Sequence, residues 1–334
     1  YMANSETNSA SLIVEEGGTL EVTVTDAESG NDTISLSTGT GVTNSLAGSI
    51  TGTYATSEGA AVAVVEGGQA YTTLQAAIDA ANDGDTVILL SDVVLDGTGK
   101  GNTEGLLSIT KNITLEGNGN TITATNVTVD SEGRGPSMIN VAGNANVTIR
   151  DLNIDGAVND TAATKHGLNI YQATVSLENV EIVNNRWYTV VANGSSLTVD
   201  GLTTSGNQWG INVDNTSGDA SLTVIDADIS EDSSIVFDKT DADGNDPVGE
   251  ISGGNFQYIV FNDGADETDL TISGGTFATG TYEGAVNIAD HLAEGLSWNS
   301  STGEVYTPST STGGGSVTRY TITIEDADHG SVKS

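Results

Sequence analysis

A short apolar motif recurs along the middle of the chain and constrains its fold more than any other feature. Aligned copies place these residues at the centre: Leu89, Leu115, Ile149, Leu177, Val199, Val224, Ile251 and Ile272. Their separations run from 21 residues, between Ile251 and Ile272, to 34 residues, between Leu115 and Ile149. The hairpins of a β-sandwich usually repeat every ~8–12 residues. The longer period therefore predicts one turn of a solenoid per copy.

A second apolar run lies between successive copies of this motif. It occupies residues 138–141, 167–170, 189–191, 210–213, 235–237, 259–261 and 286–288. Each coil therefore supplies at least two strand faces, and we expect a third. Strands that pair with their equivalents one coil later leave unpaired edges only at the two ends of the stack. We predict an all-β fold, a parallel β-helix over residues 61–307.

Residues 71–90 are expected to form one short amphipathic helix, a glycine stop and then a buried strand, Val87 to Leu90, before the repeats begin. The apolar residues of the helix follow helical i, i+3, i+4, i+7 spacing: Leu74, Ala77, Ile78 and Ala81. Thr72 is the expected N-cap and Gln75 completes a capping-box pattern, while Gly84 is the expected helix stop. A single helix before many short strands predicts an N-terminal cap on the stack.

Both ends of the chain depart from the repeat. Residues 1–60 alternate apolar and polar positions around Gly17 and Gly18, which predicts a β-rich segment or a small β domain with a hairpin. Residues 288–294 predict a helical turn, stopped at Gly295, that closes the C-terminal end. Residues 308–317 read as a flexible linker. Residues 318–334 hold one strand, expected to be the start of a truncated module or a strand donated to another copy through residues 318–325. The chain begins at Tyr1, and we expect a processed or cut piece.

Charge excludes some partners. The sequence has 46 acidic and 9 basic residues, a net charge of −37, which repels phosphates and argues against nucleic-acid binding. No apolar run approaches the ~18 residues of a membrane span. There is no cysteine, and large repeat folds with continuous cores can do without disulfides. The acidity itself predicts either a solvated surface or a bound hard cation such as Ca²⁺.

The phrases at residues 71–95, 109–122 and 146–156 resemble pectin-lyase-like right-handed parallel β-helix proteins, especially the cell-surface versions of Gram-positive gut bacteria. The closing phrase at residues 287–307 is also similar to theirs. This resemblance covers about residues 62–307. It implies a right-handed β-helix that is secreted or displayed on the cell surface. It says little about function, because the fold carries lyases, hydrolases, adhesins and inert stalks.

The resemblance implies two active-site patterns to look for. A lyase needs an arginine base with acidic calcium ligands, and Arg150 with Asp151 and Asp155 could supply them, although a surface ion pair is the favoured interpretation. A polygalacturonase-like hydrolase needs a Gly-His-Gly segment and several Asp. His166 precedes Gly167 but follows a lysine, and no Asp-Asp pair occurs, so a turn histidine is favoured. We expect no catalytic site.

Aromatic residues recur at one place just before a strand, each next to a polar donor. The pairs are Arg186–Trp187, Gln208–Trp209 and Gln257–Tyr258. Aligned on successive coils, they would form an edge that stacks on sugar rings and donates hydrogen bonds to them. An internal aromatic stack that fills the core is the slightly favoured interpretation, and Ser233 interrupts the series.

One loop concentrates the oxygen ligands that a cation would need. Its candidates are Asp238, Asp241, Asp243, Asn245 and Asp246. It is not an EF-hand, because the glycine is the fourth residue counted from Asp241 and not the sixth. No cofactor is required, Ca²⁺ is the one cofactor that this loop could hold, and a polar turn between coils is the favoured interpretation.

These observations favour a non-catalytic extracellular module of the cell surface, acting as a stalk, adhesin or structural fibre component. Its expected partners are a glycan or a host or surface protein. A polysaccharide lyase or glycoside hydrolase of the same fold is one alternative. A self-assembling filament subunit that uses residues 318–325 is the other.

Overall fold

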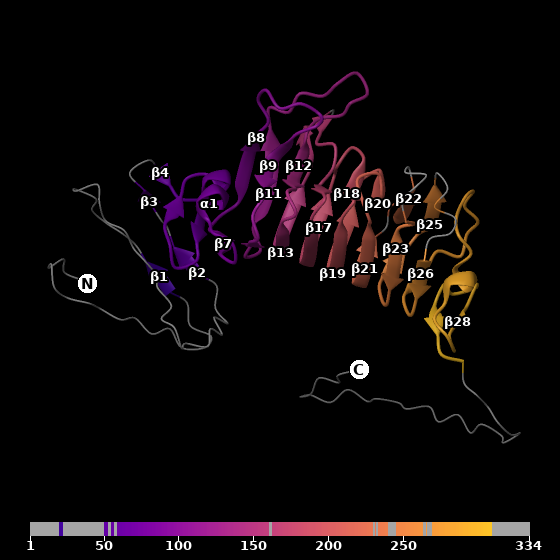
Figure 1. Cartoon of the computed structure of the whole chain (residues 1–334). Coiled ribbons are helices and arrows are strands. Elements are labelled where there is room, and N and C mark those ends of the chain that lie inside the picture. The colour runs from indigo at the N-terminus through magenta and orange to yellow at the C-terminus, as the bar shows by residue number, and fades with distance from the viewer. Residues whose placement is uncertain are drawn as a thin grey trace, which may run out of the picture.

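The computed structural model describes residues 20–22, 50–52, 55–56, 59–159, 162–229, 231, 233–239, 245–262, 265 and 269–308. Within this part the strands wind into a parallel β-solenoid, seen from the side in Figure 1. A 14-stranded sheet and a seven-stranded sheet form its walls. The predicted fold class is confirmed.

The larger sheet carries the repeated motif. Its main coil strands are β7 (Thr86–Leu89), β10 (Thr114–Glu116), β13 (Asn146–Asp155), β17 (Thr174–Val183), β19 (Ser196–Ser205), β21 (Ser221–Ile229), β23 (Val248–Ile251) and β26 (Asp269–Ile272). The predicted ladder is confirmed from Leu115 to Ile272. At its start the prediction was wrong by two residues, because Leu115 pairs with Val87 and not with Leu89. Both side chains point inward in a strand of period two, so the pattern alone could not separate the two registers.

The seven-stranded sheet holds the second apolar run. Its strands are β9 (Gly105–Ile109), β12 (Ser137–Val141), β16 (Leu168–Tyr171), β18 (Tyr188–Asn193), β20 (Trp209–Asp214), β22 (Ile235–Asp238) and β25 (Ile259–Asn262). The predicted run is confirmed from Ile139 to Ile259. Residues 286–288 do not continue it, because Ala285 bridges Val260 in antiparallel orientation. This segment therefore closes the sheet instead of adding a coil.

A third wall arises because the long strands bend in the middle. At the bend of β13, β17 and β19, Asp151, Asn179 and Gly201 have φ of 49°, 53° and 81°. This left-handed conformation is open mainly to Gly, Asn and Asp. The bend lets the residues before and after it, such as Ile149 and Leu152, both face the core. Short strands take the same wall in the end coils: β8 (Val93–Asp96), β11 (Thr121–Thr125), β24 (Asn255–Phe256) and β27 (Thr276–Phe277).

Helix α1 (Leu74–Ala80) covers the N-terminal end of the stack, as predicted, but its ends differ. The N-cap is Thr73, whose Oγ1 accepts the Ala76 N–H at 3.2 Å, and not Thr72. Gln75 forms no capping box, because its amide pairs with the backbone of Ser108 in β9. Gly84 lies beyond the C-cap and donates its N–H to the Asn112 carbonyl at 2.6 Å.

Antiparallel strands flank this helix and finish the N-terminal end. β5 (Ala63–Val65) pairs antiparallel with both β7 and β6 (Ala70–Tyr71). The β7 edge of the first coil is therefore not left as a bare parallel edge. Before it lie β1 (Leu20–Val22), β2 (Ile50–Gly52), β3 (Ala55–Thr56) and β4 (Gly59–Ala60). The predicted hairpin at Gly17 and Gly18 is outside the described residues.

The C-terminal end is also closed. The predicted helical turn is a 3₁₀ helix, η2 (Ile288–His291), shorter than expected. Leu292 just after it bridges Ile272, and Glu304 bridges Thr276. The hairpin of β28 (Ser297–Trp298) and β29 (Val305–Tyr306) completes the end. The described helices include none long and apolar enough to cross a membrane. Residues 309–317 of the predicted linker and the predicted strand at 318–325 lie outside the described part.

A polar ladder runs inside the solenoid through four successive coils. The Thr164 hydroxyl donates to Asn185 Oδ1 at 2.8 Å, and Asn185 Nδ2 donates to Asn207 Oδ1 at 2.9 Å. Asn207 Nδ2 then donates to Glu231 Oε1 at 2.9 Å, and Thr204 also donates to this carboxylate. Thr164, Asn185 and Glu231 are buried, so each needs these partners.

Candidate functional site

An aromatic cluster lies where β18 and β20 begin. Tyr188 is the first residue of β18 and pairs in register with Trp209, the first residue of β20. The ring centroids are 5.0 Å apart for Tyr188 and Trp209, and 6.1 Å apart for Trp187 and Trp209. All three side chains are half-buried, so the cluster forms part of the surface and is not an internal stack.

His166 forms the inner side of this cluster. Its ring centroid lies 6.2 Å from that of Trp187 and 5.8 Å from that of Tyr188. Burial, with a contribution from the charge of Lys165, lowers the pKa of His166 to about 3. Nδ1 accepts the Tyr188 N–H at 3.2 Å, which fixes the neutral ring against the start of β18. A buried, neutral imidazole with its nitrogen so engaged supports the cluster and is poorly suited to exchange protons with a substrate.

Cationic side chains gather around Trp187. Arg134 Cζ lies 5.5 Å from the ring centroid and Lys165 Nζ lies 5.6 Å from it. Both distances fall within the ~6 Å of a cation–π contact. Burial and the charge of Arg134 lower the pKa of Lys165. Arg186 is near as well, since a Cβ on Gly133 would lie 3.3 Å from its Nε.

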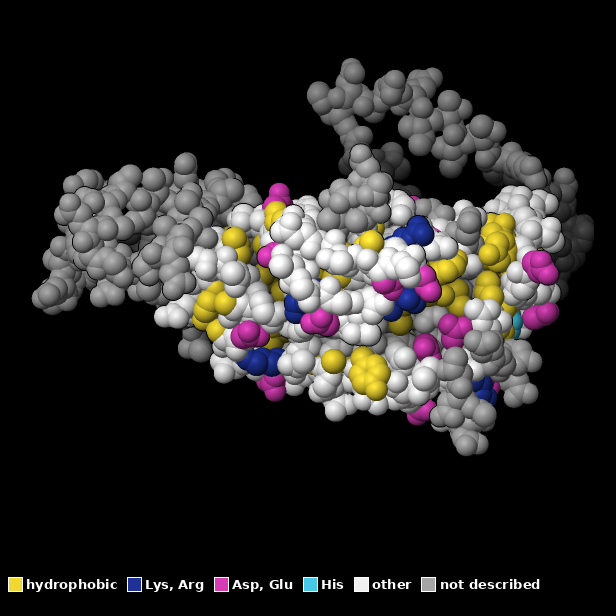
Figure 2. Space-filling model, turned by 90° about the horizontal axis from the view of Figure 1, so that it is seen from above, with side chains coloured by type: hydrophobic (Ala, Val, Ile, Leu, Met, Phe, Trp, Pro, Cys, Tyr) yellow, Lys and Arg dark blue, Asp and Glu magenta, His cyan; other side chains and the backbone are white. Residues whose placement is uncertain are grey.

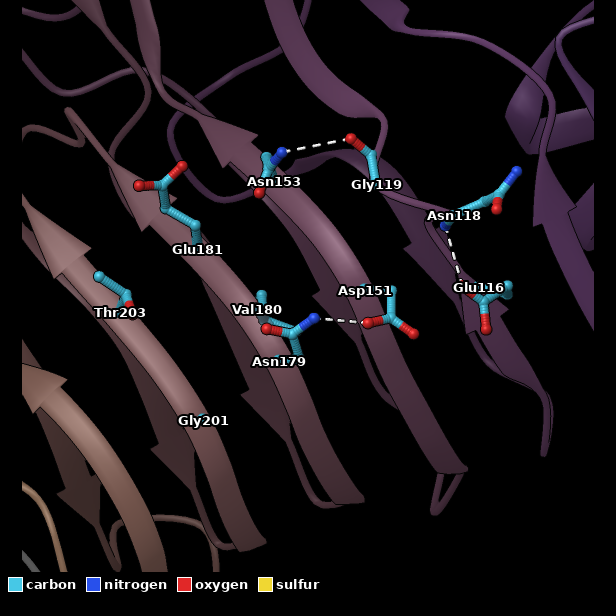
Figure 3. A pocket seen from close by; sticks show the side chains of 10 residues that line it. All are labelled: Glu116, Asn118, Gly119, Asp151, Asn153, Asn179, Val180, Glu181, Gly201 and Thr203. Carbon is cyan, nitrogen blue, oxygen red and sulfur yellow. Dashed lines mark hydrogen bonds between the residues drawn. The ribbon is translucent and has the colours of Figure 1, made fainter. Parts of the chain in front are cut away.

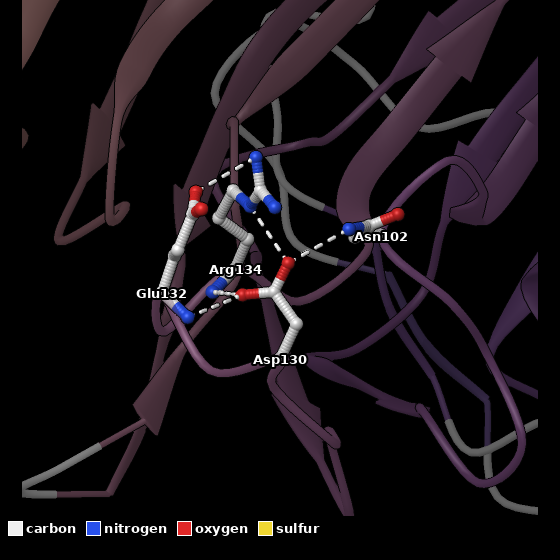
Figure 4. Close-up of polar contacts among 4 residues, drawn as sticks. All are labelled: Asn102, Asp130, Glu132 and Arg134. Carbon is white, nitrogen blue, oxygen red and sulfur yellow. Dashed lines mark hydrogen bonds and ion pairs between the residues drawn. The ribbon is translucent and has the colours of Figure 1, made fainter.

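The loop that carries Arg134 is ordered by one carboxylate, shown in Figure 4. Asp130 accepts hydrogen bonds from Arg134 N at 3.0 Å, Arg134 Nε at 2.7 Å, Glu132 N at 2.9 Å and Asn102 Nδ2 at 2.9 Å. These bonds, led by the one from the Arg134 backbone, hold the pKa of Asp130 far below its usual range. Arg134 also pairs with Glu132 at 2.9 Å. Two carboxylates thus fix its guanidinium above Trp187.

The remaining predicted glycan residues divide between two places. Gln208 is exposed beside Trp209. Tyr258 lies two coils further on, where its ring stacks on Tyr282 at a centroid distance of 4.5 Å, with Gln257 next to it in sequence. Ser233 and Ser234 lie in the coil between these two places. Their carbonyls accept hydrogen bonds from the N–H groups of Gly210 and Ile211 in the preceding coil, and the Ser234 N–H donates to the Tyr258 carbonyl in the following coil. The aromatic edge is therefore interrupted, as the serine predicted.

The four candidate catalytic residues do not form one site. Arg150 Nε forms an ion pair at the surface, but its partner is Glu116, at 2.5 Å, and not Asp151 or Asp155 as the sequence suggested. Asp151 accepts from Asn179 Nδ2 at 2.5 Å, and Asp155 accepts from Asn184 Nδ2 at 2.9 Å near the end of β13. His166 lies instead in the aromatic cluster. A hollow of about 410 Å³ opens along the bend of β13 and β17, lined by Asp151, Glu116, Glu181 and neutral polar residues (Figure 3).

The two described carboxylates of the predicted calcium loop are engaged. Asp246 pairs with Lys239 Nζ at 2.8 Å, and Asp238 accepts from Asn212 Nδ2. Asn245 donates its amide to Asp219 at 3.0 Å. The other two candidates, Asp241 and Asp243, lie outside the described residues. Among the residues that the structure describes, no group of three or more His, Cys, Asp or Glu is arranged to hold a metal.

The sequence pointed to Trp187, Trp209 and Arg186 but missed Tyr188, Lys165 and Arg134 as their neighbours. The repeat register, which aligns residue 188 with residue 209, could have indicated Tyr188.

Comparisons with family models, curated proteins and solved structures return no match. The fold and the site therefore define the class: a parallel β-solenoid, closed at both ends, with an aromatic and cationic cluster on its surface.

Proposed function

We propose that this chain is a non-catalytic module of the extracellular cell surface, acting as a stalk, adhesin or fibre component, and that it binds glycan at the aromatic cluster. The observation that carries the proposal is the half-exposed pair Trp187 and Trp209 on neighbouring coils of a rigid stack. We further infer kinship with the pectin-lyase-like surface proteins of Gram-positive gut bacteria. The matching phrases and the solenoid support this kinship.

Physical chemistry favours a sugar as the ligand. Indole and phenol rings offer flat apolar faces, and stacking a sugar on them removes apolar area from water, worth about 25 cal/mol per Å². The rings are already held by Tyr188, His166 and Arg134, so binding orders few side chains. Hydrophobic side chains gather only in small separate patches on the face shown in Figure 2. A protein partner would usually need a larger hydrophobic patch than these.

Binding would be tested on an array of soluble oligosaccharides, followed by calorimetry on the best ligand. Trp187→Ala should weaken that binding about tenfold or more, equivalent to ~1.4 kcal/mol. Tyr171→Ala is the matched control, because Tyr171 is 45% exposed on the same sheet but outside the cluster. Equal effects of the two variants, or no binding by the wild type, would refute the proposal.

The enzyme alternative keeps one supporting observation, the hollow beside Asp151 and Glu181. Incubating the protein with acidic and neutral polysaccharides and measuring new reducing ends tests it. Product that disappears in Asp151→Asn would favour the enzyme.

The filament alternative is tested by light scattering on the intact chain and on a chain cut at Pro308, with and without EDTA. Assemblies that vanish on cutting would favour it, and monomers in all four samples would exclude it.

A further inference from the structure

Two cations beside Trp187 lack counter-ions although the protein is strongly acidic. Of the 9 basic residues, Arg319 and Lys333 lie outside the described part. Among the others, Lys100, Arg134, Arg150 and Lys239 form ion pairs, and Lys111 Nζ donates to the carbonyls of Asp79 and Ala81. Within the described residues, the side chains of Lys165 and Arg186 make neither an ion pair nor a hydrogen bond. Lys165 lies over Trp187, and Arg186 lies against Gly133, the neighbour of Arg134 in the adjoining loop.

Leaving these charges unpaired is unfavourable. Lys165 is half-buried, and the guanidinium of Arg134 over the same indole repels its ammonium. The chain has 46 acidic residues, yet Asp130 and Glu132 form their ion pairs with Arg134. The charge of Asp130 also attracts Lys165, but burial and the charge of Arg134 outweigh this attraction and lower the pKa of Lys165. The charges of Asp238 and Asp214 act on the other side of the cluster, at Tyr188. Lys165 is half-buried and Arg186 is exposed, and a bound anion would complete the pairing of both charges.

We propose that Lys165 and Arg186 form an anion subsite, so that the sugar stacked on Trp187 carries a carboxylate or a sulfate group. This inference rests on the proposed glycan binding and specifies its ligand class. Arg134 is a positioning residue, because its charge is balanced by Asp130 and Glu132 while it holds one face of the indole.

The subsite must act locally. A net charge of −37 repels an anion at long range, and that repulsion is screened beyond ~8 Å at physiological salt. Lys165 Nζ lies 5.6 Å from the indole centroid, so a sugar that touches the ring can place an acidic substituent within reach of the ammonium. Charge-assisted hydrogen bonds to guanidinium and ammonium are about twice as strong as neutral ones. The acidic group therefore determines which sugars bind most tightly, and the aromatic rings determine which sugar shapes fit the site.

The test uses the full chain and three matched probes: lactose, sialyllactose with its added carboxylate, and 6-sulfated lactose. Affinities are measured by calorimetry at 150 mM salt. We expect the charged sugars to bind at least tenfold more tightly than lactose. Arg186→Gln should lower this preference to about threefold or less. Lys100→Gln removes a charge from a remote exposed ion pair and should leave all three affinities unchanged.

Outcomes separate the two proposals. Lactose that binds as tightly as the charged sugars, with loss in Trp187→Ala, overturns the anion subsite and leaves glycan binding intact. Preference for sialyllactose or for sulfated lactose identifies the acidic group. Absence of binding to all three, repeated on the wider array, overturns both proposals. Lys165→Gln is a second variant of the anion subsite. Its melting temperature shows whether the protein still folds when this half-buried lysine is replaced.

Discussion

The internal polar ladder makes a sharp prediction about stability. Asn207 accepts hydrogen bonds from Asn185 N and Nδ2, both at 2.9 Å, and donates to the Ile182 carbonyl at 3.0 Å and to Glu231 at 2.9 Å. Asn207→Ala removes all four. At ~1 kcal/mol net each the loss would be about 4 kcal/mol. Asn207 itself is half-buried, so water can replace part of this, and we expect about 3 kcal/mol.

Urea unfolding followed by circular dichroism measures this loss. Asn153→Ala is the matched control, because its amide makes one long bond, 3.4 Å to the Gly119 carbonyl, on the outer wall. The control should lose less than ~0.5 kcal/mol. The double variant Asn207→Ala with Glu231→Ala should lose less than the two single losses combined, by ~1 kcal/mol or more, because both remove one shared bond. Equal losses in Asn207→Ala and the control would refute the reasoning.

The remaining predictions concern His166 and one glycine. His166 has a folded-state pKa of about 3 against an ordinary 6.5, so between these values only the unfolded chain takes up the proton. Stability is therefore fully present above pH ~6.5 and falls as the pH drops toward 3, and His166→Gln should lose less stability between pH 7 and pH 4.5 in the same urea assay. A steeper fall in His166→Gln would contradict this sign. Gly210→Ala should lower the melting temperature by several degrees, because its new Cβ would lie 2.1 Å from the Ser234 carbonyl oxygen and force two coils apart. Gly101→Ala, where the nearest atom is the flexible Glu104 carboxylate at 3.6 Å, should change it by far less.

Sequence patterning predicts the walls of the solenoid where apolar and polar residues alternate strictly. Ile149, Leu177 and Val199 are such positions, and their register was predicted correctly. Residues 87–90 are all apolar, so alternation gave no information there, and Val87 was missed. The bends at Asp151, Asn179 and Gly201 were not predicted, although the aligned coils place a residue tolerant of positive φ at that point in each.

Residues of the candidate site were predictable from the sequence only where they occupy equivalent positions in successive coils. Trp187 and Trp209 follow the coil period, and their proximity came from that period. Arg134 comes from a loop more than fifty residues earlier, and its place over Trp187 depends on the bonds that Asp130 makes. Such a long-range contact leaves no periodic signal. Lys165 was visible in the sequence, but nothing there distinguished it from an ordinary surface lysine.

The covered ends of the stack fix the number of coils in the solenoid and therefore its length. β5 lies antiparallel on β7 of the first coil, and Leu292 and Glu304 bridge to the last coil, so these edges of the stack are covered by other parts of the chain. Inserting one coil between the ends would lengthen the rod by ~4.8 Å, the spacing of adjacent strands. The coil from Leu168 to Thr189 is a natural unit for such an insertion, because Val190 pairs with Leu168. The distance from the aromatic cluster to either end can therefore change only in steps of that size.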